Sequence, residues 1–91
     1  MKGRFYKTVE ILRGIAGKYT GKEAGFNDSI AKLCRIESNL IRCEIKAACG
    51  FYPCDVQRVA VLQLLPELEK IGTMENLRRF LDRSEILLFN I

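Results

Sequence analysis

The sequence predicts an all-α fold, a compact bundle of four or five helices that forms a single domain over residues 1–91. Apolar residues recur at steps of three and four along most of the chain, which is the spacing of one face of an α-helix. Glycine, proline, Asn and Asp residues separate these segments and leave only short connections, as between antiparallel helices. The composition, 48% hydrophobic and 29% charged, is typical of a globular domain. A chain of 91 residues has no material for a second core.

The first helix is predicted over residues 4–19. Its apolar side consists of Phe5, Val9, Leu12, Ile15, Ala16 and Tyr19. Gly14 and Gly17 lower the helix propensity, which suggests close packing or an early end. Residues 20–28, with two glycines, an Asn and an Asp, predict a loop, and Asn27 or Asp28 is expected to cap the next helix.

The segment from Ser29 to Cys49 fits either one long helix or two short ones. Its periodic apolar positions are Ile30, Leu33, Cys34, Leu40, Ile41, Ile45 and Ala48. Gly50 follows the last of them, where glycine commonly ends a helix because it adopts a left-handed conformation without strain.

Pro53 and Asp55 are expected to start the next helix, with Asp55 as its N-cap. Val56, Val59, Ala60, Leu62 and Leu64 form its expected apolar face. Pro66 lacks a backbone NH and is expected to kink or divide this segment. A new first turn would then carry Glu67 and Glu69 at its positive end.

Thr73 is predicted to be the N-cap of a last helix over residues 74–83, because a threonine oxygen can accept a bond from an unpaired backbone NH. Met74, Leu77, Phe80 and Leu81 would form its buried face. The chain ends with EILLFNI, whose apolar residues must be buried in the domain or against a partner.

The positive charge is concentrated in the first quarter of the chain. Residues 1–22 carry six basic residues and one acidic residue, a net charge of +5, whereas residues 23–91 carry nine basic and ten acidic residues, a net charge of −1. A basic surface attracts anionic partners such as nucleic acid, a membrane surface or an acidic protein, and the alternative is an ordinary solvated helix face.

Several classes of function are disfavoured by what the sequence lacks. It contains no histidine, so neither a Ser-His-Asp nor a Cys-His nucleophile can form. None of its seven glycines falls in a phosphate-binding GxGxxG or GxxxxGK pattern. We therefore expect no enzyme, no cofactor and no evident small-molecule substrate. The N-terminus lacks the continuous apolar core of a secretory signal, and no apolar run reaches the length of a membrane span, so we expect a cytoplasmic protein.

The four cysteines, at positions 34, 43, 49 and 54, do not have the tight pair spacing of a structural zinc site. In a continuous helix, Cys34 and Cys43 would lie about 13 Å apart on opposite sides. We expect reduced thiols and no metal site, with a disulfide between Cys49 and Cys54 as the alternative in a secreted protein.

The stretch SIAKLCRIESNLIRCEIKA resembles the helix-turn-helix of bacterial and phage repressors. Ala31 stands at the small position of the first helix, Ile36 in the turn and Ile41 at the anchor of the recognition helix. Arg35 stands where that motif usually has a glycine. The resemblance implies DNA recognition by Asn39, Arg42 and Lys46, which would share the outer face of the second helix.

Two functional hypotheses follow from these patterns. The first is a small non-enzymatic regulator or adaptor that binds another protein, including a second copy of itself as a homodimer. Arg4, Lys7 and Lys18 of the basic first helix would attract an acidic surface, and Leu87, Leu88 and Phe89 would form the apolar contact. The alternative is a DNA-binding transcriptional regulator that uses the helix-turn-helix residues, which makes nucleic acid the second expected partner.

Overall fold

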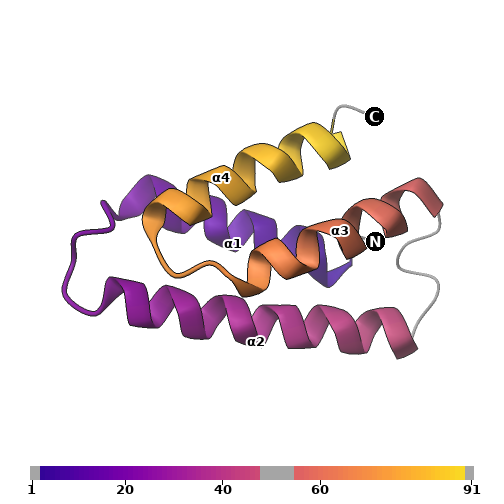
Figure 1. Cartoon of the computed structure of the whole chain (residues 1–91), viewed down its shortest axis with the longest axis horizontal. Helices are drawn as coiled ribbons and strands as arrows, with labels where there is room; N and C mark the ends of the chain where they lie inside the picture. The colour runs from indigo at the N-terminus through magenta and orange to yellow at the C-terminus, as the bar shows by residue number, and fades with distance from the viewer. Residues whose placement is uncertain (1–2, 48–54, 90–91) are drawn as a thin grey trace.

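A computed structural model describes residues 3–47 and 55–89 of the chain. The described residues form four α-helices and a short π-helical segment, and no strand is found among them (Figure 1). The elements are α1 (Arg4–Lys18), α2 (Phe26–Ala47), α3 (Asp55–Glu69), α4 (Met74–Ser84) and η2 (Glu85–Phe89). The predicted all-α bundle is therefore confirmed.

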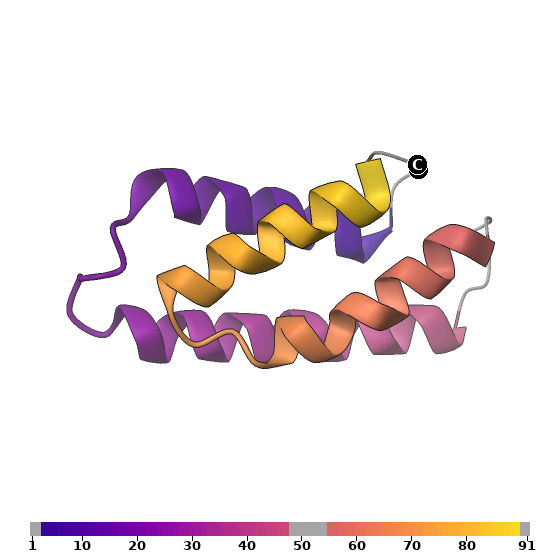
Figure 2. The ribbon, with the colours of Figure 1, turned by 45° about the horizontal axis from the view of Figure 1, so that its top comes forward.

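The helices pack around one core in a molecule that measures 40 × 26 × 21 Å. Each α-helix packs on two others, so that the contacts run from α1 to α2, from α2 to α3, from α3 to α4 and back to α1. Figure 2 shows α1 and α2 as a long hairpin that lies behind the shorter pair of α3 and α4. The largest fully buried side chains are Phe5, Leu12, Ile41, Leu64, Leu65, Leu68, Ile71 and Leu77.

The connection between α1 and α2 depends on two glycines. Gly21 has a φ of 94° and Gly25 a φ of 75°, a region that glycine adopts without strain. The Gly25 carbonyl accepts the first helical bond of α2 from the Ser29 NH at 3.0 Å. The helix consequently begins at Phe26, and the prediction that Asn27 or Asp28 caps it is wrong: both lie inside the first turn.

The two glycines inside α1 are neither packed nor terminal. Gly14 and Gly17 are exposed, and a Cβ added to either would meet no other heavy atom within 4 Å. The helix continues through both to Lys18. The suggestion of close packing or an early end is therefore wrong.

Residues 26–47 form a single α-helix of 22 residues, which settles the choice between one long helix and two short ones. The turn that a helix-turn-helix requires near Arg35 and Ser38 is absent from this described segment. The predicted helix end at Cys49 and Gly50, like Pro53, lies outside the described residues.

Helix α3 runs through Pro66 to Glu69, so the prediction that Pro66 divides the segment is wrong. Pro66 is exposed and lies within the last turn, where its missing NH removes only the bond to the Leu62 carbonyl. Asp55 is the first helical residue and not the N-cap. Val59 and Leu62, which were expected on the apolar face, are exposed, because the buried side of α3 carries Ala60, Val61, Leu64, Leu65 and Leu68.

The start of α4 agrees with the sequence. Thr73 has an extended conformation, and its Oγ1 accepts a hydrogen bond from the Asn76 NH at 3.2 Å. Met74, Leu77 and Phe80 are buried, and Leu81 is partly buried. The buried Ser84 hydroxyl donates to the Phe80 carbonyl at 2.8 Å, which satisfies this polar group within the helix.

Candidate protein-binding surfaces

The first charged cluster joins α1 to α2 and is internal. The Arg4 guanidinium donates two hydrogen bonds to the Glu37 carboxylate, from Nε at 3.0 Å and from Nη2 at 2.7 Å. The Thr8 hydroxyl donates to the same carboxylate at 2.7 Å. Glu37 is buried, so these donors replace the water that the carboxylate loses on folding.

This environment shifts the pKa of both charged partners. Burial alone would raise the pKa of Glu37, but the hydrogen bonds from Arg4 and Thr8 together with the Arg4 charge hold it below its usual value. The hydrogen bond to Glu37 raises the pKa of Arg4. Glu37 is therefore an ionised structural anion and is unsuited to act as a general base near neutral pH.

Glu44 lies next to this cluster and caps α1 from another helix. The Arg4 backbone NH donates to both Glu44 carboxylate oxygens, at 2.9 and 3.0 Å. Gly3 provides no side-chain cap, and the first turn of α1 contains no acidic residue. The Glu44 carboxylate thus supplies the negative charge that the positive end of α1 would otherwise lack.

Two further ion pairs join neighbouring helices. Arg42 of α2 pairs with Glu69 of α3 at 2.6 Å, and the Ser38 hydroxyl donates to the same carboxylate at 3.0 Å. The hydrogen bonds from Arg42 and Ser38 lower the pKa of Glu69. On the other side of α3, Arg83 of α4 pairs with Glu67 at 2.9 Å.

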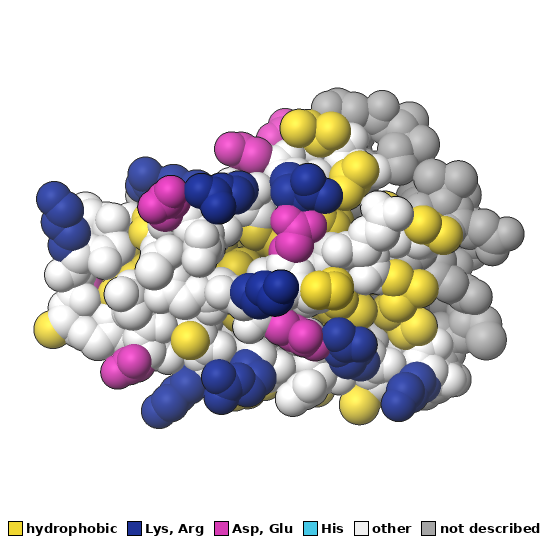
Figure 3. Space-filling view, in the orientation of Figure 1, with side chains coloured by type: hydrophobic (Ala, Val, Ile, Leu, Met, Phe, Trp, Pro, Cys, Tyr) yellow, Lys and Arg dark blue, Asp and Glu magenta, His cyan; other side chains and the backbone are white. Residues whose placement is uncertain are grey.

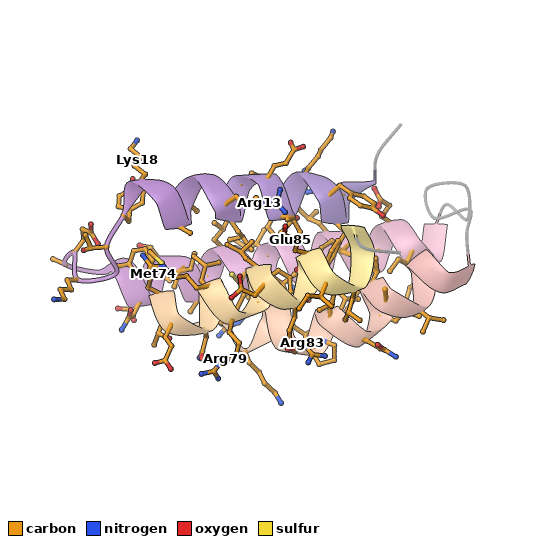
Figure 4. The ribbon with its side chains drawn as sticks, turned by 90° about the horizontal axis from the view of Figure 1, so that it is seen from above. Arg13, Lys18, Met74, Arg79, Arg83 and Glu85 are labelled. Atoms are coloured by element: carbon orange, nitrogen blue, oxygen red, sulfur yellow. The ribbon has the colours of Figure 1, made fainter. Side chains whose placement is uncertain are left out.

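The residues predicted to bind a protein partner lie in different environments. Arg4 serves the internal cluster, whereas Lys7 and Lys18 are exposed on α1. Figure 4 shows Lys18 pointing away from the bundle. Leu87 is partly buried and packs against the core, while the side chains of Leu88 and Phe89 lie outside the described residues. Arg4 is thus paired within the bundle and Leu87 is partly buried, and their contact with a partner stays a prediction.

The residues predicted to bind DNA lie on one continuous helix and not on a separate recognition helix. Asn39 and Lys46 are exposed on α2, while Arg42 is held by Glu69. Ser38, which lies between the turn position Ile36 and the anchor Ile41 of that motif, is buried inside α2. The structural basis of the repressor resemblance is therefore absent in this segment, although the three polar residues do share one side of α2.

Exposed apolar side chains gather where α1 meets α2. Arg4 and Thr8 mark the side of α1 that faces α2, and Ile11 lies on it because it follows Thr8 by three residues. Glu37 marks the side of α2 that faces α1. Leu33 and Leu40 lie four residues before and three residues after Glu37 on this side. We define the α1–α2 seam as the surface formed by Ile11, Ile15, Leu33, Ile36 and Leu40; Ile11, Ile36 and Leu40 are exposed, and Ile15 and Leu33 are partly buried.

A surface pocket of about 290 Å³ continues the seam at the turn between the two helices. It is lined by Ile15, Tyr19, Glu23, Ala24, Phe26, Ser29 and Ile30. Ile15 belongs to the seam itself, and Ser29 precedes Leu33 by one helical turn. The Glu23 carboxylate accepts hydrogen bonds from the Thr20 and Gly21 backbone NH groups, at 3.0 and 2.9 Å, and these bonds lower its pKa.

A second apolar surface lies on α3. Val59, Leu62 and Pro66 follow one another at helical spacing on its exposed side, and we call them the α3 outer face. Figure 3 shows hydrophobic side chains over α3, with basic side chains spread along α2 beneath them. On α2, the side that faces α3 carries Ser38 and Arg42, whereas the seam lies on the side that faces α1.

Two patterns in the sequence point to these surfaces, but the periodicity of a single helix does not show which of its apolar residues stay exposed. Leu33, Ile36 and Leu40 repeat at steps of three and four beside the buried series Ile30, Cys34 and Ile41, so α2 has an apolar sector wider than one neighbour covers. Val59, Leu62 and Pro66 likewise widen the apolar sector of α3. Which part of each sector stays exposed depends on tertiary packing.

The described residues contain no cluster of three or more Cys, Asp or Glu side chains arranged to hold a metal ion. Cys34 is buried and Cys43 is exposed, and both are free thiols. Within the described part of the chain, no helix has the length and apolar character needed to cross a membrane. Comparison with protein families, curated proteins and solved structures finds no match for this chain.

Proposed function

We propose that the chain is a small non-enzymatic regulator or adaptor that binds other proteins, and that the α1–α2 seam is its main contact. The observation that supports this proposal most directly is the group of exposed apolar side chains Ile11, Ile36 and Leu40 beside a surface pocket. Apolar side chains gathered in this way are typical of protein-binding sites.

The charge of the hairpin supports the same proposal. Residues 3–47 carry nine Lys or Arg and five Asp or Glu, a net charge of +4. Residues 55–89 carry five Lys or Arg and six Asp or Glu, a net charge of −1. The seam therefore lies in the basic half of the molecule, where an acidic partner is attracted over long distances.

Affinity capture from a lysate of the cells that make the protein tests this proposal. Three baits are compared: the wild type, Ile36→Glu in the seam and Val59→Glu on the α3 outer face. The two replaced side chains are matched, with exposed fractions of 56% and 53%. We expect a protein that the wild type retains and the Ile36→Glu bait loses. Three baits with the same captured proteins would contradict the proposal.

Nucleic acid binding is the second candidate, and one observation favours it. Arg35, Asn39 and Lys46 are exposed on the side of α2 that also carries Arg42, which makes one row of basic and amide groups. Such a row would contact phosphates without a helix-turn-helix. Measurement of duplex DNA binding between 0.05 and 0.3 M salt tests it, since the affinity must fall steeply with salt and must weaken in Lys46→Gln. An undetectable affinity at 0.05 M salt would exclude this candidate.

A further inference from the structure

We infer that the α1–α2 seam binds an amphipathic helix of another protein, one whose apolar stripe is flanked by Asp or Glu residues. The inference rests on the proposed protein-binding function and names the chemistry of the partner. It follows from the length of the seam, the pocket at its end and the charges along its edges.

The seam is long enough to contact a partner helix over several turns. From Ser29 to Leu40 it extends over eleven residues of α2, which corresponds to about 16 Å, or three turns of a helix. The pocket of about 290 Å³ at the Ser29 end is lined by Ile15, Phe26 and Ile30, among others, and can receive one large apolar side chain. Ile36 and Leu40 provide the remaining apolar contacts along its length. A partner helix would meet this surface with anchors at positions i, i+4, i+7 and i+11.

The edges of the seam are basic. Lys7 precedes Ile11 by four residues on α1, Lys18 follows Ile15 by three, and Lys32 precedes Ile36 by four on α2, so all three exposed lysines flank seam residues. Three nearby carboxylates are engaged within the molecule, whereas Glu10 and Asp28 are exposed at helical spacing from Lys7 and Lys32. Glu37 and Glu44 accept hydrogen bonds from Arg4, and Glu23 accepts bonds from the loop backbone.

This charge pattern favours one of the possible binding partners of the seam over the others. Acidic residues on both sides of the apolar stripe would lie against the three lysines. A second copy of the chain would place two basic seams against each other, which costs free energy. An anionic lipid surface would satisfy the lysines, but a concave pocket receives an inserted side chain better than it contacts a flat bilayer.

The test is a selection of 20-residue helices from a display library, with the full-length wild-type protein as the target. Selected helices are then measured in solution against the wild type, Ile36→Glu and Val59→Glu. We expect the enriched helices to carry Asp or Glu beside an apolar stripe. Their affinity should fall at least about tenfold for Ile36→Glu and less than about twofold for Val59→Glu.

A charge-reversed copy of the best helix, with its flanking Asp and Glu replaced by Lys, is the matched control. We expect it to bind about tenfold more weakly at 0.05 M salt, and the difference should shrink at 0.5 M salt, where screening is strong. Enriched helices with neutral or basic flanks would overturn the inference. So would binding of the wild type, but not of Ile36→Glu, to phosphatidylcholine vesicles with 30% phosphatidylserine and no seam-dependent helix.

The outcome also separates the inference from the proposed function. Helices that bind the wild type and Ile36→Glu equally but lose affinity for Val59→Glu would place protein binding on the α3 outer face. The protein-binding role would then stand with the α3 outer face as its contact, whereas the seam as the main contact and the inference would both fall. The lysate comparison, which does not depend on the library, decides the proposed function.

Discussion

Gly21 holds a position that no residue with a side chain can occupy without strain. Its φ is 94°, and a Cβ built there would lie 2.5 Å from the Cβ of Met74 at the start of α4. The position therefore fixes both the loop after α1 and its contact with α4. Gly25 has a positive φ as well, but open space surrounds it.

Alanine replacements of three glycines should change the free energy of unfolding in a defined order. We expect Gly21→Ala to lower it by about 2–3 kcal/mol, through the unfavourable φ and the collision with Met74. Gly25→Ala should lower it by about 1 kcal/mol, through φ alone. Gly14→Ala, in open space within α1, should raise it by about 0.5–1 kcal/mol. Urea denaturation measures all three, and a Gly21→Ala variant no less stable than Gly25→Ala would contradict the assigned contact.

The pair of Arg4 and Glu37 predicts a pH-dependent loss of stability. Because the pKa of Glu37 is held below its usual value, its ionised form contributes stability above about pH 4.3, the unfolded value, and this contribution is lost as the pH falls through the folded value. We expect Arg4→Met to lower the free energy of unfolding by about 1–3 kcal/mol at pH 7 and by less at pH 3. This expected loss of stability is smaller than the loss on breaking a fully buried ion pair, because the Arg4 side chain is 35% exposed.

Arg79→Met is the matched control for this change. Arg79 pairs with Glu75 within α4, and both side chains are largely exposed. The free energy of unfolding should therefore change by less than about 0.5 kcal/mol at either pH. An effect of Arg4→Met that is equal at pH 7 and pH 3 would show that lost packing, and not the charge of Glu37, causes it.

The two described cysteines should differ in reactivity. Burial raises the pKa of the Cys34 thiol to about 12, with a further contribution from the charge of Glu37, so this thiol stays protonated and enclosed. Cys43 is exposed. We expect iodoacetamide at pH 8 to modify Cys43 and to leave Cys34 unmodified until denaturant is added, as measured by peptide mass spectrometry. Equal modification of both in the native protein would contradict the packing of α2.

At the scale of single elements, structural features that depend on a few neighbouring residues are predicted best from the sequence. The Thr73 cap and the buried face of α4 are local patterns, and both are confirmed. The start of α2 was misplaced because the backbone of Gly25, and no side-chain cap, begins the helix. Pro66 did not divide α3, because buried residues on both sides of it hold the helix against the core.

The candidate site was less predictable, because exposure depends on how helices meet. Arg4 reads as one more surface cation in the sequence, and only the packing of α1 on α2 brings it to Glu37. Leu40 was expected among the apolar positions of this helix and Ile36 in the turn of the DNA-binding motif, and nothing local marks either as more exposed than Ile41. The continuity of α2 also depends on tertiary packing. A short match to a DNA-binding motif does not determine whether the chain turns at Arg35.

Removal of the Thr73 cap should weaken α4 locally. We expect Thr73→Ala to lower the free energy of unfolding by about 1 kcal/mol and to speed amide exchange at Asn76, whose NH loses its acceptor. Thr73→Ser retains the hydroxyl and should stay within about 0.5 kcal/mol of the wild type. Hydrogen exchange followed by NMR distinguishes the two variants, and faster exchange in both would show that the threonine methyl group, and not the oxygen, is needed.

At the scale of the whole molecule, ion pairs join neighbouring helices around the bundle. They connect α1 to α2, α2 to α3 and α3 to α4, through Arg4, Arg42 and Arg83 respectively. A guanidinium in such a pair has fewer N–H donors left for a partner. The exposed lysines of the hairpin are thus the charges best placed for recognition.

Deletion of residues 85–91 separates a structural role of the C-terminal segment from a binding role. Leu87 packs against the core, so we expect the deletion to lower the free energy of unfolding by about 1–2 kcal/mol. A helix selected on the seam should keep its affinity for the truncated protein at a temperature well below its unfolding transition. A loss of that affinity would instead support the C-terminal residues as the partner contact.

The carboxylate of Glu44 has a consequence for the order in which the chain acquires structure. The first turn of α1 receives its cap from a residue forty positions later in the sequence. During synthesis, therefore, α1 leaves the ribosome without the group that stabilises its positive end, and most of α2 must follow before that group arrives. The earliest part of the chain to be made is consequently dependent on a later part for its final ordering.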